Sequence, residues 1–248
     1  MNISNDPRIV LVAITKHGVA RALSVAKELP EASLAVTEKF ADTIPSIDNT
    51  LDVLSGKLSA NIAGLFERYD QVVMFISLGA VVRLIAPHLK SKDEDPGVIV
   101  IDDAGQFVIP VLSGHVGGAN AFAEKLANLT HGVAVVTTAS DVGKTIPVDI
   151  LGRDLGWKVE APKINITRVS AHVVNEEPIA FVQEAGSRKW WTRPTPLPKN
   201  IHLFDHFDDV DLSQFKAILW VTEQEIPAEK WDELTERLVV YHPPAGQT

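Results

Sequence analysis

Residues 107–122 read FVIPVLSGHVGGANAF, and this stretch decides the fold that the sequence predicts. Its first half is a short apolar run typical of a β-strand, and a glycine-rich turn follows. Apolar residues then recur at Phe122, Leu126 and Leu129, which predicts a helix beginning at Ala119. Backbone N–H groups converge at the positive end of such a helix, so the junction is a candidate anion site.

The turn carries three chemically useful side chains: the hydroxyl of Ser113, the imidazole of His115 and the amide of Asn120. Histidine titrates near neutral pH, and hydroxyls and amides both donate and accept hydrogen bonds. An ordinary tight turn with a surface histidine is an equally good interpretation. The glycines do not spell G-x-G-x-x-G, and the Gly-Lys-Thr run at residues 143–145 has Thr138 where a P-loop needs its first glycine.

Composition and charge narrow the classes of function. The 248 residues are 46% hydrophobic and 22% charged, which is ordinary for one large or two modest globular domains. A net charge of -9 without a Lys/Arg cluster argues against nucleic-acid binding. The chain has no cysteine, which excludes disulfides, thiolate catalysis and zinc-thiolate sites. The polar start at residues 1–8 and the lack of any apolar run near ~20 residues predict a cytoplasmic protein without a signal peptide or a membrane helix.

The residues before the central stretch predict alternating strands and helices. Apolar spacing from Leu51 to Leu65 is typical of a helix. A turn at residues 102–105 between two apolar runs predicts a hairpin, and therefore one antiparallel strand pair. Strands are expected at residues 9–14, 34–36, 71–76, 98–101 and 133–136, and the unbroken apolar run at 9–14 is typical of a buried strand of a parallel sheet. We expect a three-layer, Rossmann-like, mostly parallel α/β sheet over residues 1–138.

A second strand-to-helix junction lies at residues 71–87. It places Ser77 and Gly79 at the turn and Arg83 about one helical turn further on. The guanidinium of Arg83 is suited to a ligand carboxylate, although a solvated helix face explains it equally well. Ligands of open α/β sheets bind at the carboxyl ends of strands, so we expect this junction and the central loop to lie at that edge together.

Residues 139–248 predict a second, smaller α/β domain ending in a Pro-rich linker. Helices are expected at residues 148–155 and 164–174, and strands at residues 178–182, 217–221 and 238–241. Trp190 and Trp191 lie in a Pro-rich loop, where they either cover a flat ligand or partner or pack on their own domain. His202 and His206 have a metal-ligand spacing but no third strong ligand, so we expect no protein metal site.

Three ordered motifs resemble the cobalamin-biosynthesis family CbiG. They are SLGAVVRLIAP at residues 77–87, DPGVIVID at residues 95–102 and LSGHVGGAN at residues 112–120, and TTASD at residues 137–141 fits too. The resemblance covers the family's N-terminal domain and its central region. Many members carry a further C-terminal domain, and this chain stops at the Pro-rich segment where that domain would begin. We therefore expect that domain to be a separate chain, or the chain to be a truncated product.

The resemblance implies cobalt-precorrin-5A hydrolase activity, in which the δ-lactone of the macrocycle is opened and acetaldehyde is released. Such chemistry needs an activated water and donors for the developing oxyanion. On chemistry and position we assign His115 as the general base, or the acid of the second step, with Ser113 and Asn120 orienting water or the lactone. A Ser113–His115 nucleophile–base pair is less favoured, because the sequence shows no carboxylate to orient it. The expected substrate-binding residues are Ser77, Gly79, Arg83, Gly114, Gly117, Gly118 and Ala119, the last three through N–H groups that face an oxyanion or a carboxylate.

Cobalt arrives in the substrate, so no protein cofactor is expected. The expected partners are the cobalt-corrinoid substrate, a separate C-terminal domain or other enzymes of the pathway, and a second copy of the chain in a homodimer; nucleic acid and membrane are not expected. A non-catalytic tetrapyrrole-binding module that needs a separate C-terminal domain is the alternative function. A nucleotide-binding protein is a third interpretation, on fold analogy alone.

Overall fold

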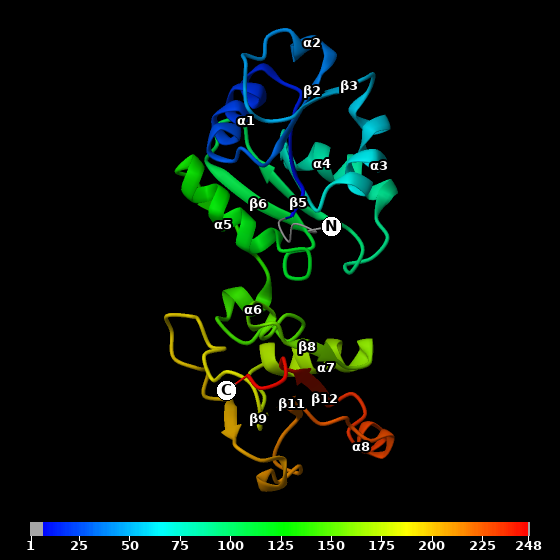
Figure 1. Ribbon diagram of the computed structural model, residues 1–248, viewed down its shortest axis with the longest axis vertical. Helices are drawn as coiled ribbons and strands as arrows, with labels where there is room; N and C mark the ends of the chain where they lie inside the picture. The colour runs from blue at the N-terminus through cyan, green and yellow to red at the C-terminus, as the bar shows by residue number, and fades with distance from the viewer. Residues whose placement is uncertain (1–6, 248) are drawn as a thin grey trace. The chain divides into compact units, whose positions relative to one another are not determined.

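The computed structural model in Figure 1 describes residues 7–247 and divides into two compact units, Met1–Val136 and Thr137–Thr248. The polar segment at residues 1–6 lies outside the described residues. The elements of the first unit are β1 Ile9–Ala13, α1 Lys16–Glu28, β2 Ser33–Thr37, α2 Glu38–Ala41, β3 Leu51–Leu54, α3 Leu58–Arg68, β4 Gln71–Phe75, α4 Leu78–Ile85, a 3-10 turn Ala86–His88, β5 Gly97–Ile101, β6 Phe107–Leu112, α5 Ala119–Thr130 and β7 Val133–Ala134.

The first unit is built on a seven-stranded sheet in the order β3-β2-β1-β4-β5-β6-β7. Its neighbouring strands run parallel except β5 and β6, which form the antiparallel hairpin that the sequence predicts. Helices α1 and α5 cover one face of the sheet, and α3 and α4 cover the other (Figure 1). The unit is therefore the three-layer, Rossmann-like domain expected from the sequence.

The burial of the central strands explains why their sequences are unbroken apolar runs. All five residues of β1 are buried, because helices exclude water from both faces. Helix α1 begins where the Thr15 side chain accepts a hydrogen bond of 2.9 Å from the Gly18 N–H. A Cβ at Gly18 would lie 2.6 Å from the Phe75 carbonyl oxygen, so glycine allows α1 to pack closely on β4.

The second unit has a five-stranded sheet in the order β10-β9-β11-β12-β8, in which only β8 is antiparallel to its neighbour. Two apolar clusters fill its two faces, one of them beneath α7. The unit is the second, smaller α/β domain that the sequence predicts. Its elements are α6 Ala139–Val142, a 3-10 turn Arg153–Leu155, β8 Lys158–Glu160, α7 Lys163–Val174, β9 Ile179–Gln183, β10 Ile201–Phe204, a 3-10 turn Phe207–Asp209, β11 Ala217–Val221, α8 Ala228–Glu233 and β12 Leu238–His242.

Two predicted helices are wrong in part or in whole. The spacing from Leu51 to Leu65 belongs to strand β3 followed by helix α3. Gly56, with a left-handed φ of 68°, forms the turn that separates them. Residues 148–155 form turns and one 3-10 turn, because Gly152 adopts a left-handed φ of 72°. A Cβ at Gly152 would lie 2.2 Å from the Trp157 ring, so this turn is packed too closely for a helical side chain.

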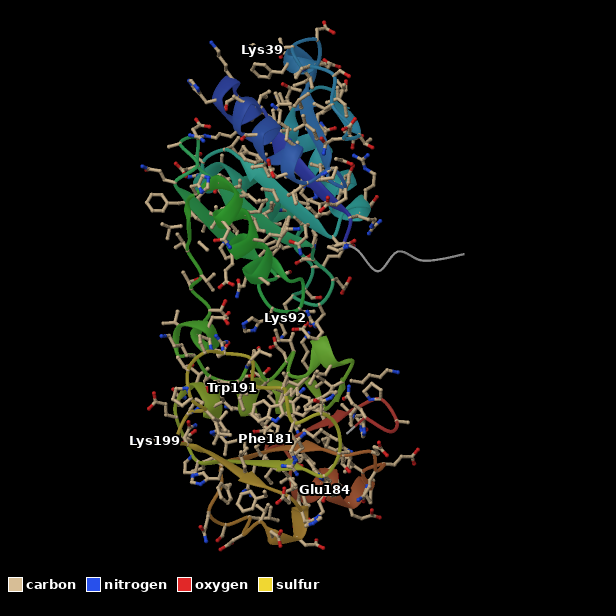
Figure 2. The ribbon with its side chains drawn as sticks, turned by 60° about the vertical axis from the view of Figure 1, so that its left-hand side comes forward. Lys39, Lys92, Phe181, Glu184, Trp191 and Lys199 are labelled. Atoms are coloured by element: carbon tan, nitrogen blue, oxygen red, sulfur yellow. The ribbon has the colours of Figure 1, made fainter. Side chains whose placement is uncertain are left out.

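The paired tryptophans pack on their own domain, which is the second of the two interpretations given above. The Trp190 ring stacks on Phe181 with centroids 4.2 Å apart, and Trp191 meets Trp190 edge-on at 6.0 Å. Each indole N–H is also satisfied locally, by Gln183 at 2.9 Å and by the Thr195 carbonyl at 2.7 Å. Trp191 and Phe181 are labelled in Figure 2 within the second unit.

Replacing Tyr241 by phenylalanine should destabilise the second unit. The Tyr241 hydroxyl is fully buried and donates a 2.8 Å hydrogen bond to the Val148 carbonyl. Burial, with a smaller contribution from the Asp149 charge, raises the pKa of Tyr241 well above its ordinary value, so the donor keeps its proton at neutral pH. Its loss leaves a buried carbonyl unpaired, which costs about 1–2 kcal/mol. Urea unfolding followed by tryptophan fluorescence measures this, because all five tryptophans lie in the second unit.

Tyr69→Phe is the matched control, because it removes the other tyrosine hydroxyl of the chain. Tyr69 lies in the first unit, where its hydroxyl donates to Asp52 at 2.7 Å from a half-exposed position. The tryptophan transition should keep its midpoint in this variant. An unchanged midpoint in Tyr241→Phe as well would show that the buried hydrogen bond adds nothing to the stability of the second unit.

Candidate functional site

The structure separates the two strand-to-helix junctions that the sequence placed together. Ser77 follows the carboxyl end of β4, as expected. The glycine loop follows β6, which runs antiparallel to β5 and therefore returns to the amino ends of the parallel strands. There Gln71 pairs with Gly97, and a Cβ at Gly117 would lie 3.2 Å from the Gly97 nitrogen. Because β4 has five residues, about 16 Å separates the two edges, and the prediction of one shared edge is wrong.

The backbone of the loop is folded tightly upon itself. Ser113 has a left-handed φ of 53°, which is unusual for a residue with a side chain, and its Oγ donates to the Asp95 carbonyl at 2.8 Å. A Cβ at Gly117 would lie 2.5 Å from the Ser113 Cβ, so only glycine fits at this position. The Ser113 hydroxyl therefore fastens the loop to the start of β5, which favours a structural role over that of a nucleophile.

A buried glutamine supports the loop from the sheet. Gln71 is only 4% exposed, and its Nε2 donates to the Gly117 carbonyl. Among the described residues its Oε1 has no hydrogen-bond partner. A Cβ at Gly97 would lie 2.2 Å from this Oε1, so glycine at the start of β5 makes room for the amide. Gln71 holds the peptide that enters α5.

The first amides of α5 serve the loop itself. The Gly118 N–H donates to the His115 carbonyl at 3.0 Å, and the Ala119 N–H donates to the Ser113 carbonyl at 3.3 Å. These two groups do not form the oxyanion site that the sequence suggested, because their hydrogen bonds are already made. Within the described part of the chain the Gly117 N–H has no backbone acceptor, so it is the remaining donor of the three.

His115 and Asn120 differ in their surroundings. Asn120 is 8% exposed and lies in the first turn of α5, where a Cβ at Gly114 would be 2.5 Å from its Oδ1. This contact makes Asn120 and Gly114 a packed pair that shapes the loop. His115 lies between Gly114 and Gly117 in the sequence and is half-buried. It is the ionisable side chain of the loop.

A pocket of about 430 Å³ borders the loop at Val116 and Gly117. Five acidic residues and two basic ones line it, which disfavours a polycarboxylate ligand by charge. The Arg8 side chain lies here and forms an ion pair with Asp70 at 2.9 Å. The side-chain hydrogen bond from Arg8 holds the pKa of Asp70 below its usual range.

At the opposite edge, Ser77 lines a pocket, whereas the Arg83 side chain lies along its own helix. Ser77 precedes α4 and lines a pocket of about 510 Å³. Arg83 is exposed, and its Nη1 donates to the Gly79 carbonyl at 2.9 Å along its own helix. In this conformation the Arg83 guanidinium lies back on Gly79, away from the glycine loop at the other edge.

Sequence reasoning missed two residues that support the glycine loop at the amino edge of the sheet. Gln71 had a signal, a polar residue at the start of an apolar strand. Asp95 also had one, since it precedes a Pro-Gly pair. It is 8% exposed, and its two carboxylate oxygens share the Lys90 N–H, at 3.0 and 3.1 Å. Their roles depend on contacts distant in sequence, which no local pattern encodes.

Residues 7–247 contain no group of three or more His, Asp or Glu side chains placed to hold a metal ion. None of the helices described is long and apolar enough to span a bilayer.

The fold and the glycine loop define a two-domain α/β protein with an open, mostly parallel sheet in its first unit. Residues 60–141 match the family described as cobalamin synthesis G N-terminal, and residues 146–243 match the cobalamin biosynthesis central region. The chain belongs to the CbiG family of cobalamin-biosynthesis proteins, as the sequence motifs indicated.

Curated relatives and a solved structure agree with this assignment. The chain is 43% identical, over 94% of its length, to a cobalt-precorrin-5A hydrolase of Priestia megaterium. It is 28% identical, over 96% of its length, to a cobalt-precorrin-5A hydrolase of Salmonella typhimurium. It spans 62% and 66% of the lengths of these relatives. A cobalamin biosynthesis protein G homologue from Sulfolobus solfataricus has the same fold, with a TM-score of 0.51 at 20% identity over 95% of this chain and 60% of that one.

Proposed function

We propose that this chain is a cobalt-precorrin-5A hydrolase, which opens the δ-lactone of the macrocycle and releases acetaldehyde. The observation that carries the proposal is the 43% identity, over 94% of the chain, to a relative with that name. The geometry of the glycine loop supports it, because the loop presents a titratable imidazole on a rigid support.

In the first step, His115 takes a proton from a water molecule that attacks the lactone carbonyl. The bond between the acyl carbon and the ring oxygen breaks, and the freed oxygen takes up a proton to give a carboxylate and a hydroxyl. The Gly117 N–H is the loop donor that we assign to the developing oxyanion. Ser113 and Asn120 act as positioning residues, because their side chains fix the backbone of the loop.

In the second step, the new hydroxyl loses its proton and becomes the carbonyl of acetaldehyde. The bond between this carbon and the macrocycle breaks, and the conjugated ring takes the electron pair. No oxidant or reductant is consumed, so the proposal needs no protein cofactor. The cobalt ion belongs to the substrate.

The substrate-binding assignment changes with the structure. Gly114, Gly117 and Gly118 remain with the loop, Gly114 and Gly117 as close-packed positions and Gly118 with a left-handed φ of 76°. Ser77, Gly79 and Arg83 lie at the other edge of the sheet and are not part of this proposed active site. The acidic pocket beside Gly117 disfavours the substrate's carboxylates, so we expect the macrocycle to reach the loop from the side of His115.

The alternative proposal is a tetrapyrrole-binding module that becomes active only with a separate C-terminal domain. The two relatives are longer than the part that matches this chain, which spans 62% and 66% of their lengths. In both cases we place the chain in the cytoplasm, with a cobalt-corrinoid as its ligand. Other enzymes of the pathway and a second copy of the chain are the remaining proposed partners.

The test is to incubate the purified chain with cobalt-precorrin-5A and to follow acetaldehyde with a coupled alcohol dehydrogenase. We expect acetaldehyde in an amount equal to the substrate consumed. Binding of the coloured substrate without acetaldehyde, followed by release once the C-terminal domain of a relative is added, would support the alternative. Neither binding nor release would contradict both proposals.

A further inference from the structure

A second pocket lies at the carboxyl edge of the first sheet, away from the glycine loop. Its volume is about 510 Å³, which is in the range of small-molecule sites. Residues following β1, β3, β4 and β5 line it, among them Thr15, Lys57, Ser77 and Asp103. Strands β1 and β4 are neighbours here, and the chain proceeds outward from them in opposite directions. Open α/β sheets bind ligands at this kind of strand-order reversal.

The lining divides into an apolar part and a polar part. The apolar part includes Ile14, Leu58, Ile76 and Leu84, which suits a flat, uncharged body. The polar part offers the Lys57 ammonium and the hydroxyls of Ser59 and Ser77, which are donors for an anion, while Asp103 is an acceptor.

The polar side chains are placed to meet a ligand. Lys57 and Ser77 are exposed residues that precede α3 and α4, and neither side chain caps its own helix. Thr15 Oγ1 donates to Asp103 Oδ1 at 3.3 Å, which leaves the other carboxylate oxygen of Asp103 as a further acceptor.

We infer that this pocket binds a phosphate-bearing molecule of mononucleotide size, at a site separate from the glycine loop. The phosphate lies with Lys57 and Ser77, because Lys57 carries a positive charge and the Ser77 hydroxyl does not cap its own helix. A sugar hydroxyl donates to Asp103, and the base packs on the apolar part of the lining.

The start of α1 favours a phosphate position on the side of α3 and α4. The Gly18 N–H at the start of α1 already donates to Thr15 Oγ1 at 2.9 Å. Gly18 is also pressed against β4, with 2.6 Å between its ideal Cβ position and the Phe75 carbonyl oxygen. One amide of the first turn of α1, where dinucleotide-binding sheets usually hold a phosphate, is therefore already paired.

The experiment is a calorimetric titration of the full chain with AMP, with inorganic phosphate and uroporphyrin III as comparison probes. Lys57→Glu reverses the charge at the phosphate position and should weaken AMP binding by at least about tenfold. Ala80→Phe fills the pocket from its half-buried lining position and should abolish binding. The matched control is Lys92→Glu, which makes the same charge change at the opposite edge and should leave the AMP affinity unchanged.

Three outcomes would overturn the inference: no AMP binding by the wild-type chain, equal weakening by Lys57→Glu and Lys92→Glu, or displacement of AMP by uroporphyrin III. The last result would assign the pocket to a carboxylated tetrapyrrole. Binding is measured without turnover, so failure of this inference leaves the proposed hydrolase activity untouched. Circular dichroism of each variant identifies loss of folding, and Lys57 is exposed, so its substitution keeps the test valid if Ala80→Phe unfolds.

Discussion

Alanine at His115 is expected to lower the rate of acetaldehyde release by about 10²–10⁴-fold, the usual contribution of a general acid–base group. The loop backbone is held by Gln71 and by the Ser113 hydroxyl, neither of which depends on the imidazole. Folding and substrate binding should therefore persist in the variant. Single-turnover release of acetaldehyde, with substrate affinity measured separately, distinguishes the loss of a base from the loss of binding.

His17→Ala is the matched control, because it removes an exposed imidazole from the first turn of α1 at the other edge of the sheet. Its rate should equal that of the wild-type chain. Full activity in His115→Ala would remove the imidazole from the mechanism and would leave the loop as a binding element only.

The second large effect is expected for Gly117→Ala. The added methyl would lie 2.5 Å from the Ser113 Cβ and 2.8 Å from the Ser113 carbonyl oxygen, so the loop has to open. Overpacking of this kind costs about 1–3 kcal/mol of stability. Displacing the loop by about 1 Å should also lower the rate of acetaldehyde release by about 10²-fold. Urea unfolding followed by far-ultraviolet circular dichroism measures the first effect, since the first unit contains no tryptophan.

Gly64→Ala makes the same chemical change where the structure leaves room. Gly64 is inside helix α3, and apart from the adjacent backbone of that helix no atom of the described residues lies within 4 Å of the added methyl. Alanine should stabilise this helix by about 0.5–1 kcal/mol and leave the rate unchanged. Wild-type stability and activity in Gly117→Ala would show that the loop is looser than its packing indicates.

Much of the fold could be predicted because its strands are buried on both faces. The apolar runs that became β1, β4 and β5 stand out for that reason, and the turn residues between β5 and β6 predict the hairpin correctly. The helix predicted from Leu51 failed because an edge strand and the next helix happen to share an apolar spacing of three and four.

The site was harder to predict, because its position depends on strand direction. The hairpin itself implies that the chain after β6 returns to the amino edge, yet the pattern of strand, glycine turn and helix is the same at either edge. The support from Gln71 joins residues 46 positions apart, and the bond from Ser113 to Asp95 spans 18. Contacts at such separations follow from the folded sheet and not from a local pattern.

The most direct measurement lets the purified chain act on cobalt-precorrin-5A in water enriched in heavy oxygen. It then determines which product carries the heavy oxygen. Hydrolysis by an activated water predicts one labelled oxygen in the new carboxylate of the macrocycle and an equal amount of released acetaldehyde. Bound substrate with an unlabelled, intact lactone would contradict the central claim and identify the chain as a binding module.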